Sequence, residues 1–453
     1  MKTAIVSIVF ALLFSSLAHP SKLRHWEIAS CDPDRIYLTF NGDPATTRAV
    51  SWRTSVDIKT AYAEIAPALA APGFDLAARR ISAKTEAVDL NQVNDNTQGT
   101  VHFHTVRFEA LQPDTLYAYR VGDGEHYWSE WIQFRTAKSE PAPFSFLYFG
   151  DAQNDILSRW SRTIRMAQQT VPDAAFMLHC GDLVDHAHND NEWSQWFKAG
   201  GFLHAQITGI PVLGNHEYVG SFLALGEKTK SILWRPQFNL PVEKSLPNNL
   251  HETCYTVEYQ GARVIVLNSN QHQEEQTEWL ETQLKRPGAQ WLIVAFHHPL
   301  FPPAGRVYFA DELRTDWLNL IKRYNVDLLL QGHDHSYMRG QLPQLDQPEQ
   351  FQTLVITSVS GPKQYPSNTD QAERYAARGF TDDRRGENGQ FFQQIHIDGD
   401  TLTYRSYLAN GERYDEASIH KNLETGQKSL SVGTETPATR TFKNTPDYSK
   451  ANL

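Results

Sequence analysis

Residue types that can bind a metal ion follow a series of apolar runs in the middle of the chain. Each run reads as a buried strand, and carboxylate, amide or imidazole side chains come directly after it. The strand ends read Gly150-Asp151, Gly181-Asp182, Gly214-Asn215-His216-Glu217, His297-His298 and Gly332-His333-Asp334-His335. Because ligands gather at the carboxyl ends of strands in layered α/β proteins, we expect these side chains to lie close together.

This mixture of side chains suits a pair of metal ions. Carboxylates, a neutral amide and imidazoles together favour divalent or trivalent cations of borderline hardness. One carboxylate can bridge two metals about 3.5–4 Å apart, which is the spacing used for in-line displacement at phosphorus. A glycine beside such a ligand lets the backbone approach the site closely. A lone Gly-Asp or His-x-His is a weak signal, whereas five strand ends in this order predict a two-metal centre.

The elements that must position these residues alternate between strands and helices, which is typical of an α/β domain. We expect strands at 144–149, 174–180, 264–268, 291–296, 326–330 and 354–359. Helices are expected at 156–170, 192–204, 274–285 and 310–324, and a late hairpin at 391–397 and 401–408. The pattern predicts an α/β domain over 143–415, followed by a polar C-terminal tail over 416–453.

The residues before this domain have an all-β texture, with strand-like alternation at 49–52 and 101–108. A turn signal then leads into a strand on which Tyr117, Tyr119 and Val121 share one face. This stretch resembles the corner of a fibronectin type III-like sandwich, where a tyrosine anchors the strand after a turn. Trp52 is expected in the core. The pattern predicts a β-sandwich over 30–137, joined to the α/β domain by a short linker.

The first residues are typical of a secretory signal peptide over 1–18. Lys2 gives a short positive region, 5–13 is apolar, and Ser16 and Ala18 are small residues at the positions a signal peptidase inspects. This predicts a secreted or periplasmic protein. No later run of about 18 apolar residues occurs, so no membrane span is expected in the mature chain.

Composition excludes some classes of function. The 453 residues include 42 basic and 52 acidic side chains, a net charge of −10, and 40% are hydrophobic. A folded core is therefore expected, and binding to nucleic acid by bulk charge is not. A small phosphate ester remains possible as a substrate, because bound metal supplies local positive charge. Three cysteines do not make a disulfide framework, and the sequence leaves their pairing open, as it does the oligomeric state.

The order of the strand-end motifs resembles the calcineurin-like metallophosphoesterases, and most closely their purple acid phosphatase branch. The resemblance spans about residues 36–414. It implies a fibronectin type III-like domain followed by an α/β metallophosphoesterase domain with two mixed sheets flanked by helices. It also implies two metal ions per chain, with iron, zinc or manganese as the candidates.

The resemblance implies a role for each motif residue. Asp182 would bridge the two metals, and His216 would contact the phosphate or protonate the leaving group. Asp151 and His335 would complete metal site one, while Asn215, His297 and His333 would complete metal site two.

The sequence departs from the family at two positions. The purple enzymes carry a tyrosine three residues after the bridging aspartate, where this chain has Asp185. Other members carry a histidine two residues after the first aspartate, where this chain has Gln153. Either residue could coordinate metal or lie just outside the ligands, and the metal identity stays open. Arg306, His298 and Tyr218 are further candidates for contacts with substrate.

The resulting hypothesis is an exported phosphoesterase that hydrolyses phosphate monoesters by in-line attack of a metal-bound hydroxide. A phosphodiesterase or nucleotidase on the same metal site is one alternative. A secreted binding protein with a vestigial metal site is the other.

Overall fold

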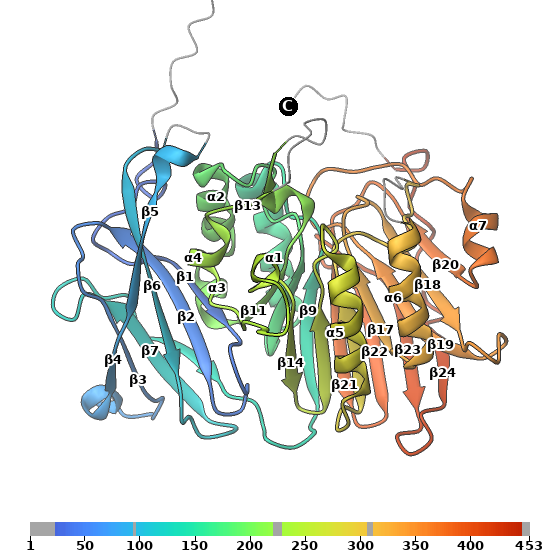
Figure 1. Ribbon diagram of the computed structural model, residues 1–453, viewed down its shortest axis with the longest axis horizontal. Coiled ribbons are helices and arrows are strands. Elements are labelled where there is room, and N and C mark those ends of the chain that lie inside the picture. The colour runs from blue at the N-terminus through green and yellow to red at the C-terminus, as the bar shows by residue number, and fades with distance from the viewer. Residues whose placement is uncertain (1–22, 94–96, 221–228, 306–310, 446–453) are drawn as a thin grey trace, which may run out of the picture.

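The computed structural model describes residues 23–93, 97–220, 229–305 and 311–445 (Figure 1). A β-sandwich at the N-terminal end stands beside a larger α/β part, which confirms the predicted fold class. The predicted signal peptide, residues 1–18, lies outside the described residues. Within the described ranges, no helix is long and apolar enough to cross a membrane.

The N-terminal sandwich has two four-stranded layers. One layer contains β1 (Asp34–Thr39), β2 (Arg48–Ser55), β6 (Thr100–Phe108) and β5 (Lys84–Asp89) in that order. The other contains β4 (Arg79–Ser82), β3 (Tyr62–Pro67), β7 (Leu116–Gly122) and β8 (Ile132–Arg135). Trp52 is fully buried between them. The Tyr117 hydroxyl accepts a hydrogen bond of 2.9 Å from the Gln112 N–H, which is the anchored corner that the sequence predicts.

The α/β part is built on two sheets. The first sheet includes the sandwich layer that begins at β1. From its far edge to the neighbour of β1, its other strands are β24 (Lys428–Val432), β23 (Arg413–Lys421), β22 (Thr401–Leu408), β21 (Phe391–Asp398), β9 (Phe144–Phe149), β10 (Phe176–Cys180) and β11 (Thr208–Val212). The second sheet contains β14 (Tyr255–Tyr259), β15 (Ala262–Val266), β16 (Trp291–Ala295), β17 (Leu328–Gln331), β19 (Phe351–Thr357), β18 (Tyr337–Pro343) and β20 (Thr381–Gly386).

Helices cover the outer faces of the two sheets (Figure 1). The first sheet carries a π-helical turn at Ile156–Trp160 that runs into α1 (Ser161–Thr170), then α2 (Asp190–Gly200), α3 (Phe202–Gln206) and α4 (Trp234–Gln237). The second sheet carries α5 (Gln273–Lys285) and α6 (Asp311–Arg323), and α7 (Ala372–Ala377) lies near β20. One hydrophobic cluster draws residues from both sheets, so the sheets pack face to face.

Strand direction explains why one edge of the molecule collects the polar residues. β9, β10 and β11 are parallel to one another, and so are β15, β16, β17 and β19. Their carboxyl ends therefore open at a common edge of each sheet, as parallel pairing requires. The loops after these strands hold all the strand-end motifs that the sequence singles out.

Buried charges and a strand pairing join the sandwich to the α/β part. The Asp190 carboxylate on α2 accepts hydrogen bonds from Arg35 at 2.8 Å and Arg53 at 3.2 Å, both on sandwich strands. β1 also pairs in parallel with β11, with Thr39 opposite Gly209. The first sandwich layer is thus continuous with the long sheet, an arrangement that a separate domain on a linker does not predict.

The segment expected as a polar tail from residue 416 is partly built into the fold. β23 alternates buried and partly exposed residues next to the edge of the long sheet, and the edge strand β24 pairs with it. The ammonium groups of Lys421 and Lys428 reach the buried Asp327 carboxylate at 2.9 and 2.8 Å. Its polar composition predicts a tail, but the ion pairs of Lys421 and Lys428 with Asp327 hold part of it in the fold.

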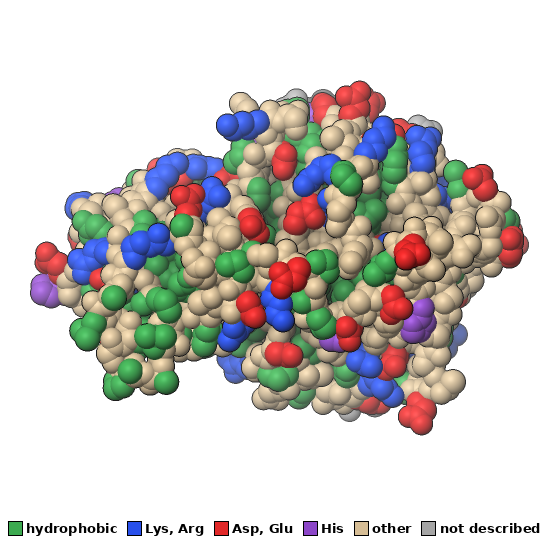
Figure 2. Space-filling model, turned by 90° about the horizontal axis from the view of Figure 1, so that it is seen from below, with side chains coloured by type: hydrophobic (Ala, Val, Ile, Leu, Met, Phe, Trp, Pro, Cys, Tyr) green, Lys and Arg blue, Asp and Glu red, His purple; other side chains and the backbone are tan. Residues whose placement is uncertain are grey.

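The described surface carries mixed charge. Figure 2 shows acidic and basic side chains interspersed over one face, with hydrophobic side chains gathered toward the sandwich end. Leu76, exposed to 92%, is one of the large apolar residues left in solvent. Cys180 and Cys254 are buried free thiols, and Cys31 is a third free cysteine.

Two histidines lie in the aromatic core under the long sheet. His179 on β10 and His204 in α3 are both buried, and the His204 ring stacks on Trp196 with ring centroids 4.1 Å apart. Burial lowers the pKa of His179 to about 3 and the pKa of His204 well below its ordinary value. Both imidazoles are therefore neutral in the folded protein at any mildly acidic pH.

Acid should destabilise the protein through these two histidines. Unfolded imidazoles bind a proton below about pH 6.5 while the buried ones stay neutral. The unfolded state then binds more protons than the folded state. The free energy of unfolding therefore decreases as the pH is lowered, by up to about 1.4 kcal/mol per pH unit for each histidine. Urea unfolding across this range should show a shallower pH dependence for His204→Met, and an unchanged one for the exposed His126→Gln. Equal slopes for wild type and His204→Met would contradict this account.

Candidate metal centre

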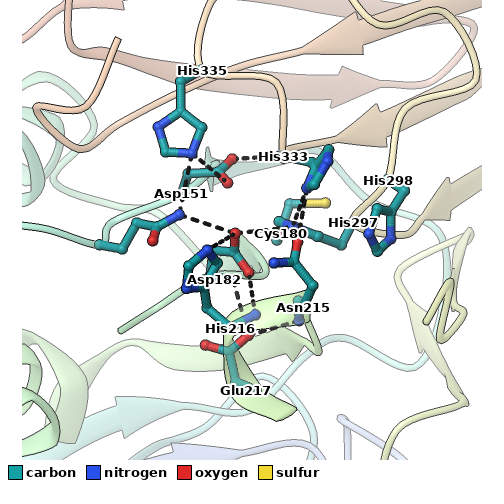
Figure 3. A network of polar contacts seen from close by, with 12 residues as sticks. Asp151, Cys180, Asp182, Asn215, His216, Glu217, His297, His298, His333 and His335 are labelled. Atoms are coloured by element: carbon teal, nitrogen blue, oxygen red, sulfur yellow. Dashed lines mark hydrogen bonds and ion pairs between the residues drawn. The ribbon is translucent and has the colours of Figure 1, made fainter. Parts of the chain in front are cut away.

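The strand-end loops of both sheets converge on one buried cluster (Figure 3). All six residues expected to bind metal take part in it. Two groups of three side chains each bring one possible donor atom within 4.8 Å of the others, namely Asp151, Asp182 and His335, and Asp182, His297 and His333. Asp182 belongs to both groups. Its position in the middle is what a carboxylate shared by two metals requires.

The residues of the first group follow β9, β10 and β17. His335 Nε2 lies 3.6 Å from Asp151 Oδ1. Gln153 is also fully buried and points into this group, because its side-chain amide donates to Asp182 Oδ2 at 3.0 Å and lies 3.1 Å from His335 Nε2. The position at which the sequence left a ligand open is therefore occupied by an amide that faces the centre.

The second group lies after β10, β11, β16 and β17. His297 Nε2 is 3.2 Å from Asp182 Oδ2. The Asn215 side-chain oxygen lies 2.8 Å from His333 Nδ1 and 3.1 Å from His297 Nε2. Asn215 thus joins the histidines in this group and completes the four residues expected for the second metal site.

Hydrogen bonds from outside the cluster orient its imidazoles. His297 Nδ1 donates to the Cys180 carbonyl at 2.8 Å, and His335 Nδ1 donates to the Lys363 carbonyl at 3.0 Å. In each ring the other nitrogen, Nε2, is left facing the carboxylates. This is the arrangement in which a backbone carbonyl fixes the tautomer of a metal-binding histidine.

The donor set fits two cations. Asp151 is fully buried, and its Oδ1 has no hydrogen-bond partner among the described residues. Burial raises the pKa of Asp151 well above its ordinary value, and the nearby charge of Asp182 raises it further. For Asp182, burial also acts upward, but the positive charges of His297 and His216 bring its pKa well below the ordinary value. Two buried carboxylates this close need compensating positive charge, which metal ions would supply.

The backbone is strained at three of the cluster residues. Asp151, Asp182 and His333 have φ angles of +30°, +51° and +69°, in the region that non-glycine residues seldom occupy. Such conformations cost about 1–3 kcal/mol each and concentrate at functional sites. Gly214 has a different reason to be glycine, because a Cβ there would lie 2.3 Å from both the backbone nitrogen and Oδ1 of Asp182.

Glu217 is a cluster residue to which the sequence assigned no role. Its carboxylate accepts hydrogen bonds from the N–H groups of Gly214 at 2.7 Å, Leu183 at 2.8 Å and Asp182 at 3.0 Å. It therefore clamps the loop after β10 to the loop after β11. The sequence signal is a Glu three residues after Gly214, the residue that caps a short helical turn, which is the spacing of a capping box.

Removing the Glu217 carboxylate should loosen the centre. Glu217→Ala leaves three buried N–H groups without an acceptor, and each costs about 1–3 kcal/mol. We expect the free energy of unfolding of the metal-free protein to fall by about 3 kcal/mol or more, and metal affinity to fall with it. Glu217→Gln keeps the shape and one acceptor oxygen, so its stability and metal affinity should lie between those of wild type and Glu217→Ala. The exposed Glu125→Ala is the control and should match wild type. Unchanged stability and metal binding in Glu217→Ala would rule out the clamp.

The remaining predicted residues lie outside the ligand groups. The Asp185 side chain points away from both groups of donor atoms, and its carboxylate lies 3.6 Å from His216 Nδ1 and 3.6 Å from His186 Nδ1. His298 contacts Ser269 Oγ through Nδ1 at 2.8 Å, and its ring lies 4.4 Å from the His333 ring. Tyr218 is buried and its hydroxyl accepts from Asn268 at 2.8 Å. Arg306 lies outside the described residues.

A pocket of about 580 Å³ opens beside the cluster. Asp185, Asn215, His216 and Tyr218 are among the residues that line it. His216 is the catalytic candidate among them, and its Nε2 lies 3.9 Å from Asp182 Oδ2. Its Nδ1 donates to the Asp185 carbonyl at 2.6 Å. His216 therefore stands between the shared carboxylate and the space in which a substrate could sit.

Comparison with known families agrees with both parts of the chain. Residues 33–136 match the family described as purple acid phosphatase, N-terminal domain, and residues 144–337 match the calcineurin-like phosphoesterase family. Together the two matches cover the sandwich and the strand-end motifs of the metal centre through His335.

The individual relatives share less than a third of their aligned residues with this chain. The chain is 28% identical over 262 residues to Fe(3+)-Zn(2+) purple acid phosphatase 12 of Arabidopsis thaliana, covering 54% of this chain and 53% of the relative. It is 26% identical over 256 residues to purple acid phosphatase 1 of Ipomoea batatas, with the same coverage. These matches span about half the length of either relative. The solved purple acid phosphatase PPD1 from yellow lupin (Lupinus luteus) has a similar fold, with a TM-score of 0.69, 18% identity and coverage of 87% of this chain and 75% of that one.

Proposed function

Since this chain belongs to the calcineurin-like phosphoesterases, in their purple acid phosphatase-like branch, we propose that it hydrolyses phosphate monoesters with the help of two bound metal ions. One observation carries the proposal. Two sets of buried donor atoms share the Asp182 carboxylate and lie beside a pocket.

The residues of each set have a defined part in this proposal. Asp151, Asp182 and His335 would hold one metal. The buried Gln153 oxygen has no hydrogen-bond partner among the described residues and would become a further donor there on rotation of its amide by about 180°. Asp182, Asn215, His297 and His333 would hold the other. When bound, such ions polarise phosphoryl oxygens and lower the pKa of water. Iron, zinc and manganese all suit these ligands.

His216 would donate a proton to the leaving oxygen. Its Nδ1 carries the hydrogen that bonds to the Asp185 carbonyl, so Nε2 is the nitrogen available for chemistry. That nitrogen lies near Asp182 and beside the pocket, where the departing group of the ester would be. Donation of a proton from Nε2 would neutralise the oxygen as its bond to phosphorus breaks.

The proposal is tested with two substrates. Purified protein, reconstituted with metal, is assayed on an aryl phosphate monoester and on the matching bis-aryl diester. Faster hydrolysis of the monoester supports the proposal. Preference for the diester would instead assign a phosphodiesterase or nucleotidase to the same centre. No turnover of either ester by protein that holds two metals would favour a secreted binding protein.

We also propose that the protein is exported, to the periplasm or the medium. The proposal rests on the charged start, apolar stretch and small residues of positions 1–18. N-terminal sequencing of protein recovered from an exporting host tests it. A mature chain that begins soon after Ala18 is the expected result, whereas retention of Met1 would contradict it.

A further inference from the structure

Lys363 lies on a loop that is fastened to the metal centre at three points. The Gly361 N–H donates to the Asp151 carbonyl at 2.7 Å, and the Tyr365 N–H donates to the His335 carbonyl at 2.8 Å. Between them, the Lys363 carbonyl accepts from His335 Nδ1 at 3.0 Å. Because these bonds attach the backbone to two proposed ligands, the lysine is held at a fixed place relative to the metals.

The side chain of Lys363 lies behind one residue of the pocket wall. Its Nζ lies 4.0 Å from Oδ1 of Asp185, which lines the pocket next to His216. The lysine side chain is 32% exposed and that of Asp185 is 24% exposed, so the pair meets at the boundary between the centre and solvent. A distance of 4.0 Å is at the outer limit of an ion pair, and an exposed pair of this kind is weak.

A permanent positive charge besides the metals would strengthen the binding of a phosphoryl group in this pocket. The described residues that line the pocket include histidines and asparagines but neither lysine nor arginine. An ammonium group is a compact point charge with three donors and is well suited to a phosphate oxygen.

We propose that Lys363 is a substrate-binding residue, which exchanges its contact with Asp185 for one with a non-bridging oxygen of the phosphoryl group. Asp185 is the counter-ion that holds the lysine in place until substrate arrives. The proposal rests on the proposed phosphoesterase function and adds to it a cation contributed by this chain. It also gives a role to Asp185, which stands where the purple acid phosphatases carry a tyrosine.

The test measures binding of inorganic phosphate to protein loaded with two metals, by titration calorimetry, with metal content determined for every variant. Lys363→Met should weaken phosphate binding by about tenfold or more, the usual scale for loss of a charged hydrogen bond. Lys363→Arg should bind phosphate within about threefold of wild type. Asp185→Asn should bind it more tightly, because the lysine has no competing partner. Lys84→Met, at an exposed site on the sandwich, is the matched control and should bind phosphate as wild type does.

Two results would overturn the proposal. One is phosphate binding by Lys363→Met within about twofold of wild type at equal metal content. The other is loss of metal from Lys363→Met, which would assign the side chain to the centre itself. If the wild type binds phosphate through Lys363 but hydrolyses neither test ester, the proposed function fails and the binding role stands. If the wild type with two metals binds no phosphate, both fail.

Discussion

Asp182→Ala is expected to lose metal and to lower kcat/KM by about a thousandfold or more. The reason is that Asp182 is the one residue common to both groups of donor atoms. Loss of the ions removes several kcal/mol of transition-state stabilisation, and each 1.36 kcal/mol is a factor of about ten in rate. Metal analysis and steady-state kinetics on an aryl phosphate measure the two effects together.

Asp182→Asn is the matched variant for this experiment. Asparagine has the same shape and tolerates the φ of +51° found at this position, but it cannot bridge as a carboxylate does. It should therefore fold normally, bind metal more weakly and turn over slowly. The exposed Asp173→Ala should behave as wild type. Retention of both metals and of full activity by Asp182→Ala would remove the basis for a shared ligand.

His216→Ala is expected to keep its metals and to lower kcat by about 10²–10⁴, the range of general acid catalysis. His216 belongs to neither group of three possible metal donors, and its Nε2 stands 3.9 Å from Asp182 Oδ2. The loss should depend on the substrate. It should be larger for an alkyl phosphate, whose leaving oxygen needs a proton, than for an aryl phosphate with an acidic phenol.

The comparison of leaving groups separates a chemical role from a structural one. A misfolded pocket would slow both substrates by the same factor and would also release metal. The exposed His126→Ala, which tests the general effect of removing an imidazole, should leave both rates unchanged. An equal loss on alkyl and aryl esters, with metals bound, would show that His216 binds substrate without moving a proton.

Strand patterns in the sequence predict the strand-end motifs, and the family resemblance implies which six of their residues are the proposed ligands. The run over Phe144–Phe149 predicts a strand with the same bounds that the structure gives to β9. An apolar run of this length is buried on both faces and lies inside a sheet. β9 pairs in parallel with β10 and antiparallel with β21, so its carboxyl end reaches the same edge as that of β10. The residue after each such strand is then placed near the others by topology alone.

The same reasoning could not distinguish Gln153 from Asp185. Each lies two or three positions beyond a proposed ligand, on a loop whose side chains can turn either way. The structure turns Gln153 inward, where its N–H also donates to the Asp182 carbonyl at 3.1 Å. It turns Asp185 outward, toward His186 and Lys363. Side-chain direction in a loop depends on contacts with other loops, which have no periodic signal in the sequence.

The amino-acid sequence by itself determined the two-part architecture and the strand-end motifs, because both follow from local periodicity and from what comes directly after each strand. Which six residues of those motifs are the proposed ligands is what the family resemblance implies. Only the tertiary structure decided the clamp made by Glu217, the place of Lys363 beside Asp185, and the joining of β1 to β11. Each of these depends on contacts between segments that lie far apart along the chain. Such contacts form when the sheets pack, and no spacing within one segment encodes them.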